Sequence, residues 1–275
     1  STGYSELQLL ELVRQPYVSR TLWFTIWQAT LSTILTLAIG LPGAYLFAHY
    51  NFLGKKLLRA VTAIPFVLPT VVVAASFTSI LGPNGWANKA LMHWLHLKTP
   101  PLMVTHTLWA ILIAHIFYNT TIILRIVGDY WTIMDPKLVR AARSLGATRL
   151  RAFARITLPL LTPAIVSAAL LVFIFDFTSF GVILLLGGPR FSTLEVAIYR
   201  QTINFFDLRM AAILSLIQLI CTLGLTVLYA RLSRKINRPL KTNRLPTNRK
   251  RRLNWKSRIA ITILIIILIT VLVVP

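Results

Sequence analysis

The sequence predicts an all-α integral membrane protein, and three observations lead to that prediction. Of its 275 residues, 56% are hydrophobic and only 13% are charged, a balance outside the averages of soluble globular domains. The hydrophobic residues gather in nearly uncharged runs, most of them long enough to cross a bilayer as a helix, which takes about 20 residues. The runs show no two-residue alternation, so helices are favoured over a transmembrane barrel.

Five complete spans and the start of a sixth are predicted in order along the chain. An external N-terminal segment at 1–20 precedes them, and Trp23 and Trp27 stand where aromatic side chains anchor a helix at the membrane boundary. In the second span Pro65 and Pro69 cannot both fit an undistorted helix, so a bend or an entry segment is expected there. The predicted spans are about 22–47, 60–81, 105–127, 160–186 and 210–231, with an incomplete sixth from Ile259.

The net charge of +22 follows the predicted topology. The connections after the first, third and fifth spans, at about 48–59, 125–157 and 231–258, hold 22 of the 29 Lys and Arg residues. This is the positive-inside asymmetry, so these connections are assigned to the cytoplasm and the alternate ones to the outside. Because the charge reports orientation, no partnership with nucleic acid is expected.

The connection between the third and fourth spans carries the most informative pattern. Asp135 is a good N-cap and Pro136 a good first helical residue, and Gly146 offers a left-handed stop about three turns later. A short helix is therefore predicted, with basic side chains opposite a small apolar face, and a second short helix should follow Thr148. The two helices would form a compact knob beneath the membrane.

This connection resembles the cytoplasmic signature of the permeases of binding-protein-dependent ABC importers, which reads Glu-Ala-Ala, three residues, Gly, nine residues, Ile-x-Leu-Pro. The resemblance implies a coupling helix that seats in a groove of a separate ATPase subunit. Arg140 stands where the family usually has Glu, which puts a local salt bridge in question but not the docking. A basic amphipathic loop resting on lipid headgroups is the alternative. The predicted coupling residues are Arg140, Ala141, Ala142, Gly146, Ile156, Leu158 and Pro159.

The resemblance runs from about Trp23 to Lys235 and implies a five-helix ABC importer permease core of the MetI-like type, followed by the start of a further transmembrane helix. Segments 179–189 and 194–199 look most like the branch that imports thiamine or ferric iron, whose permeases are often two bundles fused in one chain. The predicted division is an external segment 1–20, a transmembrane permease domain 21–236, a basic cytoplasmic linker 237–257 and a truncated helix 258–275 that would begin a second permease half.

Asp176 is the only formal charge inside an apolar run, and it costs a few kcal/mol there unless it faces protein or water. It is the leading candidate for the translocation path and would suit a cation such as thiamine, a polyamine or a metal ion. His115 and Asn119 on the third span and Gln218 on the fifth are the other candidates. The alternative for all four is hydrogen bonding between helices, which polar side chains in membranes commonly provide.

Ser192-Thr193-Leu194-Glu195 has the form of a capping box, so a short outer helix is predicted to run to about Ile203. In the resembled family this region helps to receive the substrate-binding protein. Glu195, Arg200 and Asp207 are therefore candidate contacts with that partner, and a helix resting on lipid is equally open.

No phosphate-binding loop, metalloprotease motif or nucleophile elbow is present, so no catalytic residue is predicted. With one cysteine, Cys221, and widely spaced histidines, neither a metal nor a cofactor is expected. The sequence thus predicts a multi-pass permease of the bacterial inner membrane. Its expected partners are an ABC ATPase, a periplasmic or lipid-anchored substrate-binding protein, and a second permease half, fused or homodimeric. An ion-coupled secondary carrier that uses Asp176 is the alternative.

Overall fold

The computed structural model describes residues 13–52 and 54–236, together with residue 262. The described part is helical, and four of its helices are long and apolar enough to cross a membrane, or five if a sharply bent pair counts as one span. These findings confirm the predicted fold class. The predicted linker 237–257, the truncated helix 258–275 apart from residue 262, and most of segment 1–20 lie outside the described residues.

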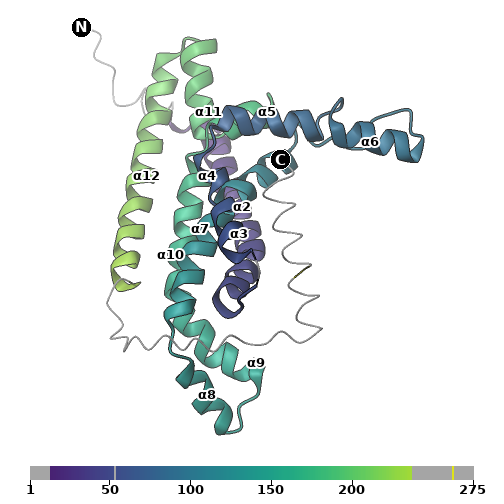
Figure 1. Cartoon of the computed structure of the whole chain (residues 1–275). Helices are drawn as coiled ribbons and strands as arrows, with labels where there is room; N and C mark the ends of the chain where they lie inside the picture. The colour runs from purple at the N-terminus through teal and green to yellow at the C-terminus, as the bar shows by residue number, and fades with distance from the viewer. Residues whose placement is uncertain (1–12, 53, 237–261, 263–275) are drawn as a thin grey trace.

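The long helices form an elongated bundle (Figure 1). Helix α7 is its centre, with 78% of its most apolar stretch buried, whereas α12 lies at the edge with only 22% buried. Helix α2 packs closely along α7 because Gly40 has no side chain: a Cβ there would lie 2.7 Å from Cβ of Ile123. Helix α10 covers both, and Ser167 and Ser233 join it to α12 through hydroxyl oxygens 3.0 Å apart. The bundle comprises α2 (Pro16–His49), α7 (Leu108–Ile133), α10 (Leu158–Phe177) and α12 (Leu208–Ile236).

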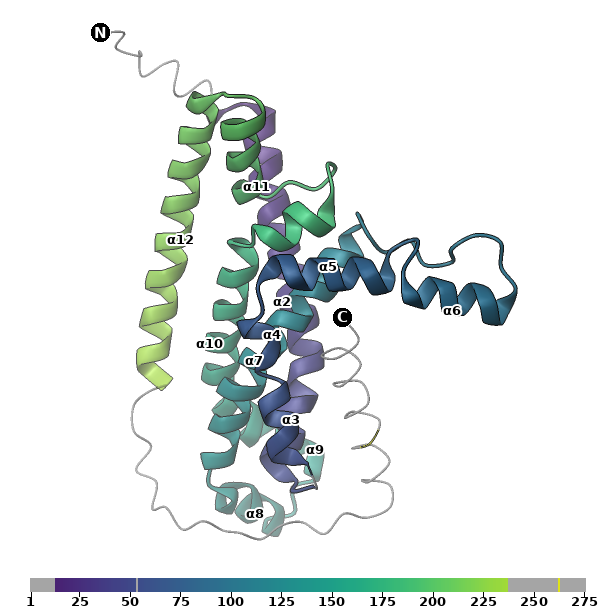
Figure 2. The same ribbon diagram turned by 45° about the horizontal axis from the view of Figure 1, so that its top comes forward.

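The predicted second span is broken, as its two prolines indicate. Pro65 lies in the first turn of α4 (Ile64–Val67), and Leu68 is extended immediately before Pro69, the conformation that a following proline imposes. The helical segments on the two sides of this break are bent by 106°. Figures 1 and 2 show that α5 and α6 run away from the bundle as an arm. The remaining elements are α3 (Lys55–Val61), α5 (Thr70–Leu81) and α6 (Trp86–Leu95).

The fourth predicted span ends earlier than the sequence suggests. Helix α10 stops at Phe177, and after a short break the chain forms a π-helical turn, η2 (Ile183–Gly187). At Gly181 the chain passes so close to Thr70 of α5 that a Cβ would collide with it. The apolar run 160–186 predicted one helix. The chain instead forms two segments, and the close approach of Gly181 to α5 lies between them.

The short outer helix is confirmed as α11 (Leu194–Tyr199) with a π-helical extension, η3 (Arg200–Asn204). The predicted capping box is wrong, because no side chain of the segment caps α11. Instead, Thr25 of α2 accepts a hydrogen bond from the backbone N–H of Leu194 at 3.0 Å. The local pattern predicted a cap from a side chain next to α11. The cap comes instead from a hydroxyl of the neighbouring helix α2.

Candidate functional site: a cytoplasmic knob and a buried polar cluster

The predicted knob is present, and its first helix is α8 (Pro136–Ser144). An oxygen of the Asp135 carboxylate accepts a hydrogen bond from the backbone N–H of Lys137 at 2.8 Å, which caps the start of the helix. At the other end Gly146 has a φ of 88°, and Ala147 donates from its N–H to the carbonyl of Ala142 at 3.0 Å. This is a glycine-terminated helix end in which the last carbonyls are satisfied.

The second part of the knob is continuous with the membrane bundle. Thr148 caps α9 (Arg149–Ala152) by accepting from the N–H of Arg151 at 3.3 Å, and a π-helical turn, η1 (Phe153–Thr157), leads directly into α10. The segment Arg149–Phe177 therefore behaves as one helix long enough to cross the membrane.

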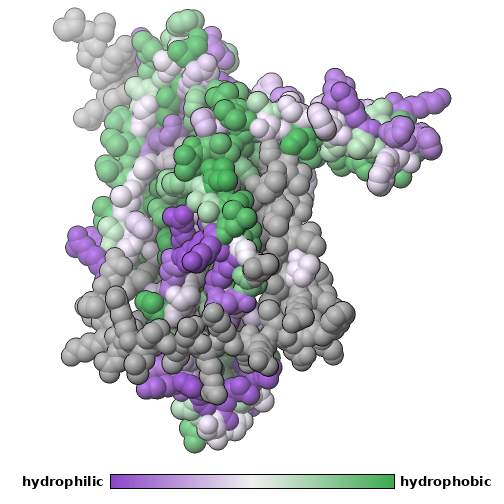
Figure 3. All heavy atoms as spheres, viewed as in Figure 1, coloured by the Kyte–Doolittle hydropathy of each residue, from purple (hydrophilic) through white to green (hydrophobic). Residues whose placement is uncertain are grey.

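The signature residues fall in two places along this knob. Arg140 and Ala141 are exposed on α8, and Gly146 forms the turn that ends it. Ile156 is half-buried in η1, whereas Leu158 and Pro159 begin α10. In Figure 3 hydrophilic residues gather at the lower end of the molecule, where Figure 1 places α8 and α9. The first group is therefore available to a partner, and the second group ties the knob to the bundle.

Asp176 lies in a fully buried cluster that joins three helices, and three of the four residues predicted for the path meet there. One oxygen of its carboxylate, Oδ1, accepts from Nδ2 of Asn119 at 2.7 Å. The same oxygen lies 3.3 Å from Nδ1 of His115. The side chains of Asp176, His115 and Asn119 are 0%, 2% and 4% exposed. The fourth predicted residue, Gln218, is not in this group.

Helix α2 contributes two residues to the cluster that the sequence reasoning missed. Gln28 donates from Nε2 to the backbone carbonyl of Asp176 at 2.9 Å, and Oγ of Ser32 lies 2.9 Å from Nδ1 of His115. The other ring nitrogen, Nε2, is 2.9 Å from Oγ of Ser179. A neutral imidazole with its proton on Nδ1 fits this arrangement, accepting at Nε2 from the Ser179 hydroxyl.

A signal for the α2 contribution was present in the sequence. Five of the polar residues of this largely apolar helix recur at three- or four-residue spacing, which places them on one face. All five are buried in the structure, where a polar stripe has to find partners on neighbouring helices. They are Thr21, Thr25, Gln28, Ser32 and Thr36.

Gln218 and Glu195, which were predicted for different sites, bond to each other instead. Gln218 of α12 donates from Nε2 to the Glu195 carboxylate of α11 at 3.0 Å. Burial raises the pKa of the Glu195 carboxyl, and the hydrogen bond from Gln218 opposes that rise. Arg200 donates to the backbone carbonyls of Pro189 and Gly188 at 2.9 and 3.0 Å. The third outer candidate, Asp207, accepts from the backbone N–H of Met210 at 3.0 Å, so all three bond within the chain.

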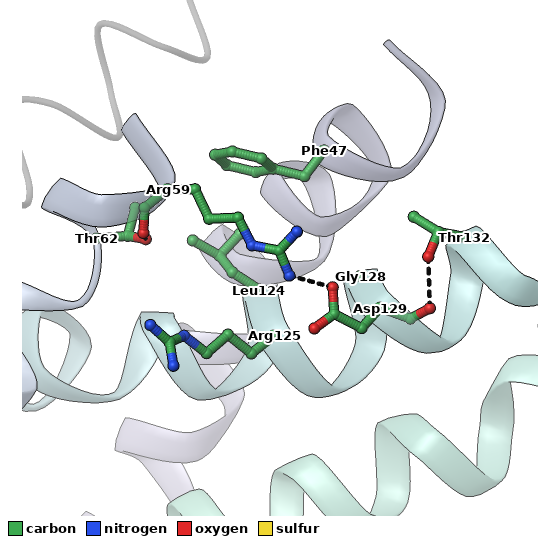
Figure 4. A pocket seen from close by; sticks show the side chains of 8 residues that line it. All are labelled: Phe47, Arg59, Thr62, Leu124, Arg125, Gly128, Asp129 and Thr132. Atoms are coloured by element: carbon green, nitrogen blue, oxygen red, sulfur yellow. Dashed lines mark hydrogen bonds and ion pairs between the residues drawn. The ribbon is translucent and has the colours of Figure 1, made fainter. Parts of the chain in front are cut away.

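A second charged contact lies between α3 and α7 (Figure 4). The guanidinium of Arg59 donates to the Asp129 carboxylate, with Thr62 and Arg125 close by. Both side chains of the pair are about half exposed, at 50% and 56%, so the pair contributes less than about 1 kcal/mol. The pair is one contact between the first part of the broken span and α7.

No group of three or more metal-binding side chains occurs among the described residues. The candidate site comprises the capped helices of the knob and a set of hydrogen bonds that join α2, α7 and α10. It defines a polytopic helical membrane protein in which the knob is continuous with a hydrogen-bonded bundle.

Sequence comparison identifies the family to which this protein belongs. Residues 40–238 match the family described as binding-protein-dependent transport system inner membrane component, and the chain is a member of that family. It is therefore a multi-pass permease of the inner membrane and not the ATPase subunit.

Relatives named thiamine transport system permease protein ThiP share this stretch. The protein from Brucella abortus is 37% identical over 211 residues, covering 75% of this chain and 38% of the relative. The protein from Haemophilus influenzae is 32% identical over 234 residues, covering 83% of this chain and 42% of the relative. The sulfate transport system permease protein CysT of Salmonella typhimurium is 30% identical over 181 residues, covering 66% of this chain and 63% of that relative. The chain thus spans about two fifths of the length of the ThiP relatives.

Solved structures have the same fold. A bacterial alginate ABC transporter, in complex with an alginate-bound periplasmic protein, aligns with a TM-score of 0.67 at 20% identity, covering 86% of this chain and 84% of the other. The MetNI methionine ABC transporter in an inward-facing conformation aligns with a TM-score of 0.54 at 19% identity, covering 86% of this chain and 100% of the other. The predicted MetI-like core is confirmed.

Proposed function

We propose that this chain forms one half of the translocation pathway of an ATP-driven importer and that a separate ATPase drives it through the knob. The observation that carries the proposal is the continuity of Arg149–Phe177, which makes the knob the cytoplasmic end of a membrane-crossing helix. A motor that grips α8 can then move α10 within the membrane. Family membership over residues 40–238 supports the same conclusion.

The proposal extends to the other partners of such a system. A substrate-binding protein on the outer side would deliver the cargo, and a second permease half, fused or homodimeric, would complete the pathway. The relatives' greater length supports a fused pair, since this chain covers 42% of the protein from Haemophilus influenzae. We propose thiamine as the cargo, because several relatives at 30–37% identity are named thiamine permeases.

Uptake by the complete transporter tests this function. The full-length permease, its ATPase and its binding protein are placed in proteoliposomes, and entry of labelled thiamine is followed with and without ATP. We expect ATP-dependent entry of thiamine and none of labelled sulfate, with an ATPase variant that cannot hydrolyse ATP as the control. Thiamine entry driven by an ion gradient without ATP would instead support the secondary carrier. ATP-driven entry of sulfate would show that the cargo is sulfate and not thiamine.

Replacing Gly146 with alanine tests the knob itself. A side chain at a φ of 88° is strained by about 1 to 2 kcal/mol, so α8 should lose its fixed end. We expect Gly146→Ala to reduce ATP-driven uptake severalfold while the thermal midpoint of the purified protein changes little. Gly54→Ala is the matched control, since Gly54 has a φ of 82° and, like Gly146, no atom within 4 Å of an added Cβ. Equal uptake by the two variants would contradict a coupling role for α8.

Asp176, His115, Asn119 and Gln218 remain proposed pathway residues. Their burial implies that they meet a solute only if the helices around them separate. The clamp between α2, α7 and α10 would then have to open during transport, which makes these hydrogen bonds part of the proposed cycle.

A further inference from the structure

The outer surface of α8 and α9 carries exposed leucines beside its basic residues. Leu138, Leu145 and Leu150 are 52%, 90% and 77% exposed, and no residue of α8 is buried. Exposed apolar side chains of this size, gathered at one end of a molecule, mark a surface that another protein covers.

The exposed apolar residues of α8 form a stripe with a basic border. Leu138, Ala141 and Leu145 recur at three- and four-residue spacing, so they lie on one face of the helix. Steps of about 100° per residue place Lys137 and Arg140 on one side of this stripe. Lys137 borders the stripe, whereas Arg140 lies about 100° from Ala141, its nearest member, so a groove must extend around the helix to meet both the ammonium and the guanidinium group.

These positive charges are not neutralised within the described part of the chain. Asp135 is the only acidic residue between Met134 and Pro159, and it is occupied in capping α8. The ion pairs among the described residues are Arg59 with Asp129 and His115 with Asp176, and neither pair includes a residue of the knob. The basic residues of this stretch are Lys137, Arg140, Arg143, Arg149, Arg151 and Arg155.

A bilayer is a poorer fit for this surface than a protein groove. A helix bound to a membrane surface lies with its apolar face at the acyl boundary. Figures 1 and 2 instead show α8 at the end of the molecule, beyond the cytoplasmic ends of α3 and α10. Helix α8 therefore lies where a protein on the cytoplasmic side can reach it.

Resting on the proposed function, we infer that the ATPase groove that receives α8 is acidic at its edge and apolar at its floor. Leucines 138 and 145 fill the floor, and carboxylates of the ATPase pair with Lys137 and Arg140. The charge at position 140 is then a determinant of which ATPase this permease accepts, because a groove built for a glutamate there would repel arginine.

Binding of the full-length permease to the ATPase subunit that co-purifies with it tests this inference. The permease is held in nanodiscs of neutral phosphatidylcholine, and the Kd is measured at low and high salt. We expect Arg140→Glu to raise the Kd by about tenfold or more, as reversal of a contacting charge does, and wild-type binding to weaken as salt rises. The control is Lys89→Glu on α6, which makes the same change in charge outside the knob and should leave the Kd unchanged. Exchange of a groove carboxylate for lysine should restore binding of Arg140→Glu.

Each other outcome has a distinct meaning. If the wild-type permease and the Arg140→Glu variant bind the ATPase with the same Kd, the acidic groove is overturned and the importer function remains intact. An effect of Arg140→Glu that appears only in nanodiscs with anionic phosphatidylglycerol would assign the knob's charges to lipid and also overturn it. Failure of the wild-type permease to bind any ATPase subunit would remove the proposed function itself.

Discussion

Alanine at Gly40 is expected to lower the thermal midpoint of the protein markedly, although it adds only one methyl group. The added Cβ would lie 2.7 Å from Cβ and 2.8 Å from Cγ2 of Ile123, far inside van der Waals contact. Ile123 is completely buried in α7, and β-branched side chains in helices are confined to one main rotamer. Since neither helix can yield locally, α2 must move away from α7, at a cost of about 1 to 3 kcal/mol.

Gly224→Ala is the matched control for this prediction. An added Cβ at Gly224, in the edge helix α12, meets nothing within 4 Å. Alanine there should be neutral or stabilise the helix by up to about 1 kcal/mol, because glycine in a helix interior is unfavourable. Thermal unfolding of both variants in the same detergent measures the difference, and a Gly40→Ala protein as stable as Gly224→Ala would contradict the close packing of α2 on α7.

The helices and the knob could be predicted because their signals are local. Asp135, Pro136 and Gly146 determine where α8 begins and ends through their own backbone chemistry, and the structure confirms each role. Pro65 and Pro69 likewise indicate a break. They do not determine its angle of 106°, which depends on what the two segments pack against.

The pairing of side chains between helices was only partly predictable. Asn119 and Asp176 were both recognised as unusual polar residues, but their hydrogen bond joins positions 57 residues apart. One sequence marks the polar face of a helix but does not say which residues of another helix that face meets. For the same reason Glu195 was assigned to an external partner, whereas its carboxylate is held by Gln218 of α12.

Two substitutions of Asp176 are expected to separate its structural role from its charge. In Asp176→Leu, Nδ2 of Asn119 loses the acceptor that it reaches at 2.7 Å, and His115 loses its neighbour at 3.3 Å. The Asn119 donor left without a partner costs about 1 to 3 kcal/mol, whereas Nδ1 of His115 keeps Oγ of Ser32 at 2.9 Å. We therefore expect Asp176→Leu to yield little folded protein, measured as the monodisperse fraction after extraction from the membrane.

Asp176→Asn should fold, because the amide keeps an oxygen in place for Asn119. Its new NH₂ group replaces Oδ2, a buried oxygen that lacks a hydrogen-bond partner, and Oε1 of Gln28 is likewise buried without one. Gln28 already bonds to the backbone carbonyl of Asp176, so a small rotation offers the new donor an acceptor. The thermal midpoint of this variant should therefore stay near that of the wild type.

Uptake by the folded Asp176→Asn protein then decides whether the carboxylate takes part in transport. A charge that binds a cationic cargo in the pathway cannot be replaced by a neutral amide, so a pathway role predicts loss of ATP-driven thiamine entry at an unchanged thermal midpoint. A clamp that only holds α2, α7 and α10 together predicts uptake close to that of the wild type. The second result would remove Asp176 from the pathway, since its hydrogen bonds would be sufficient to explain why an acid is buried there.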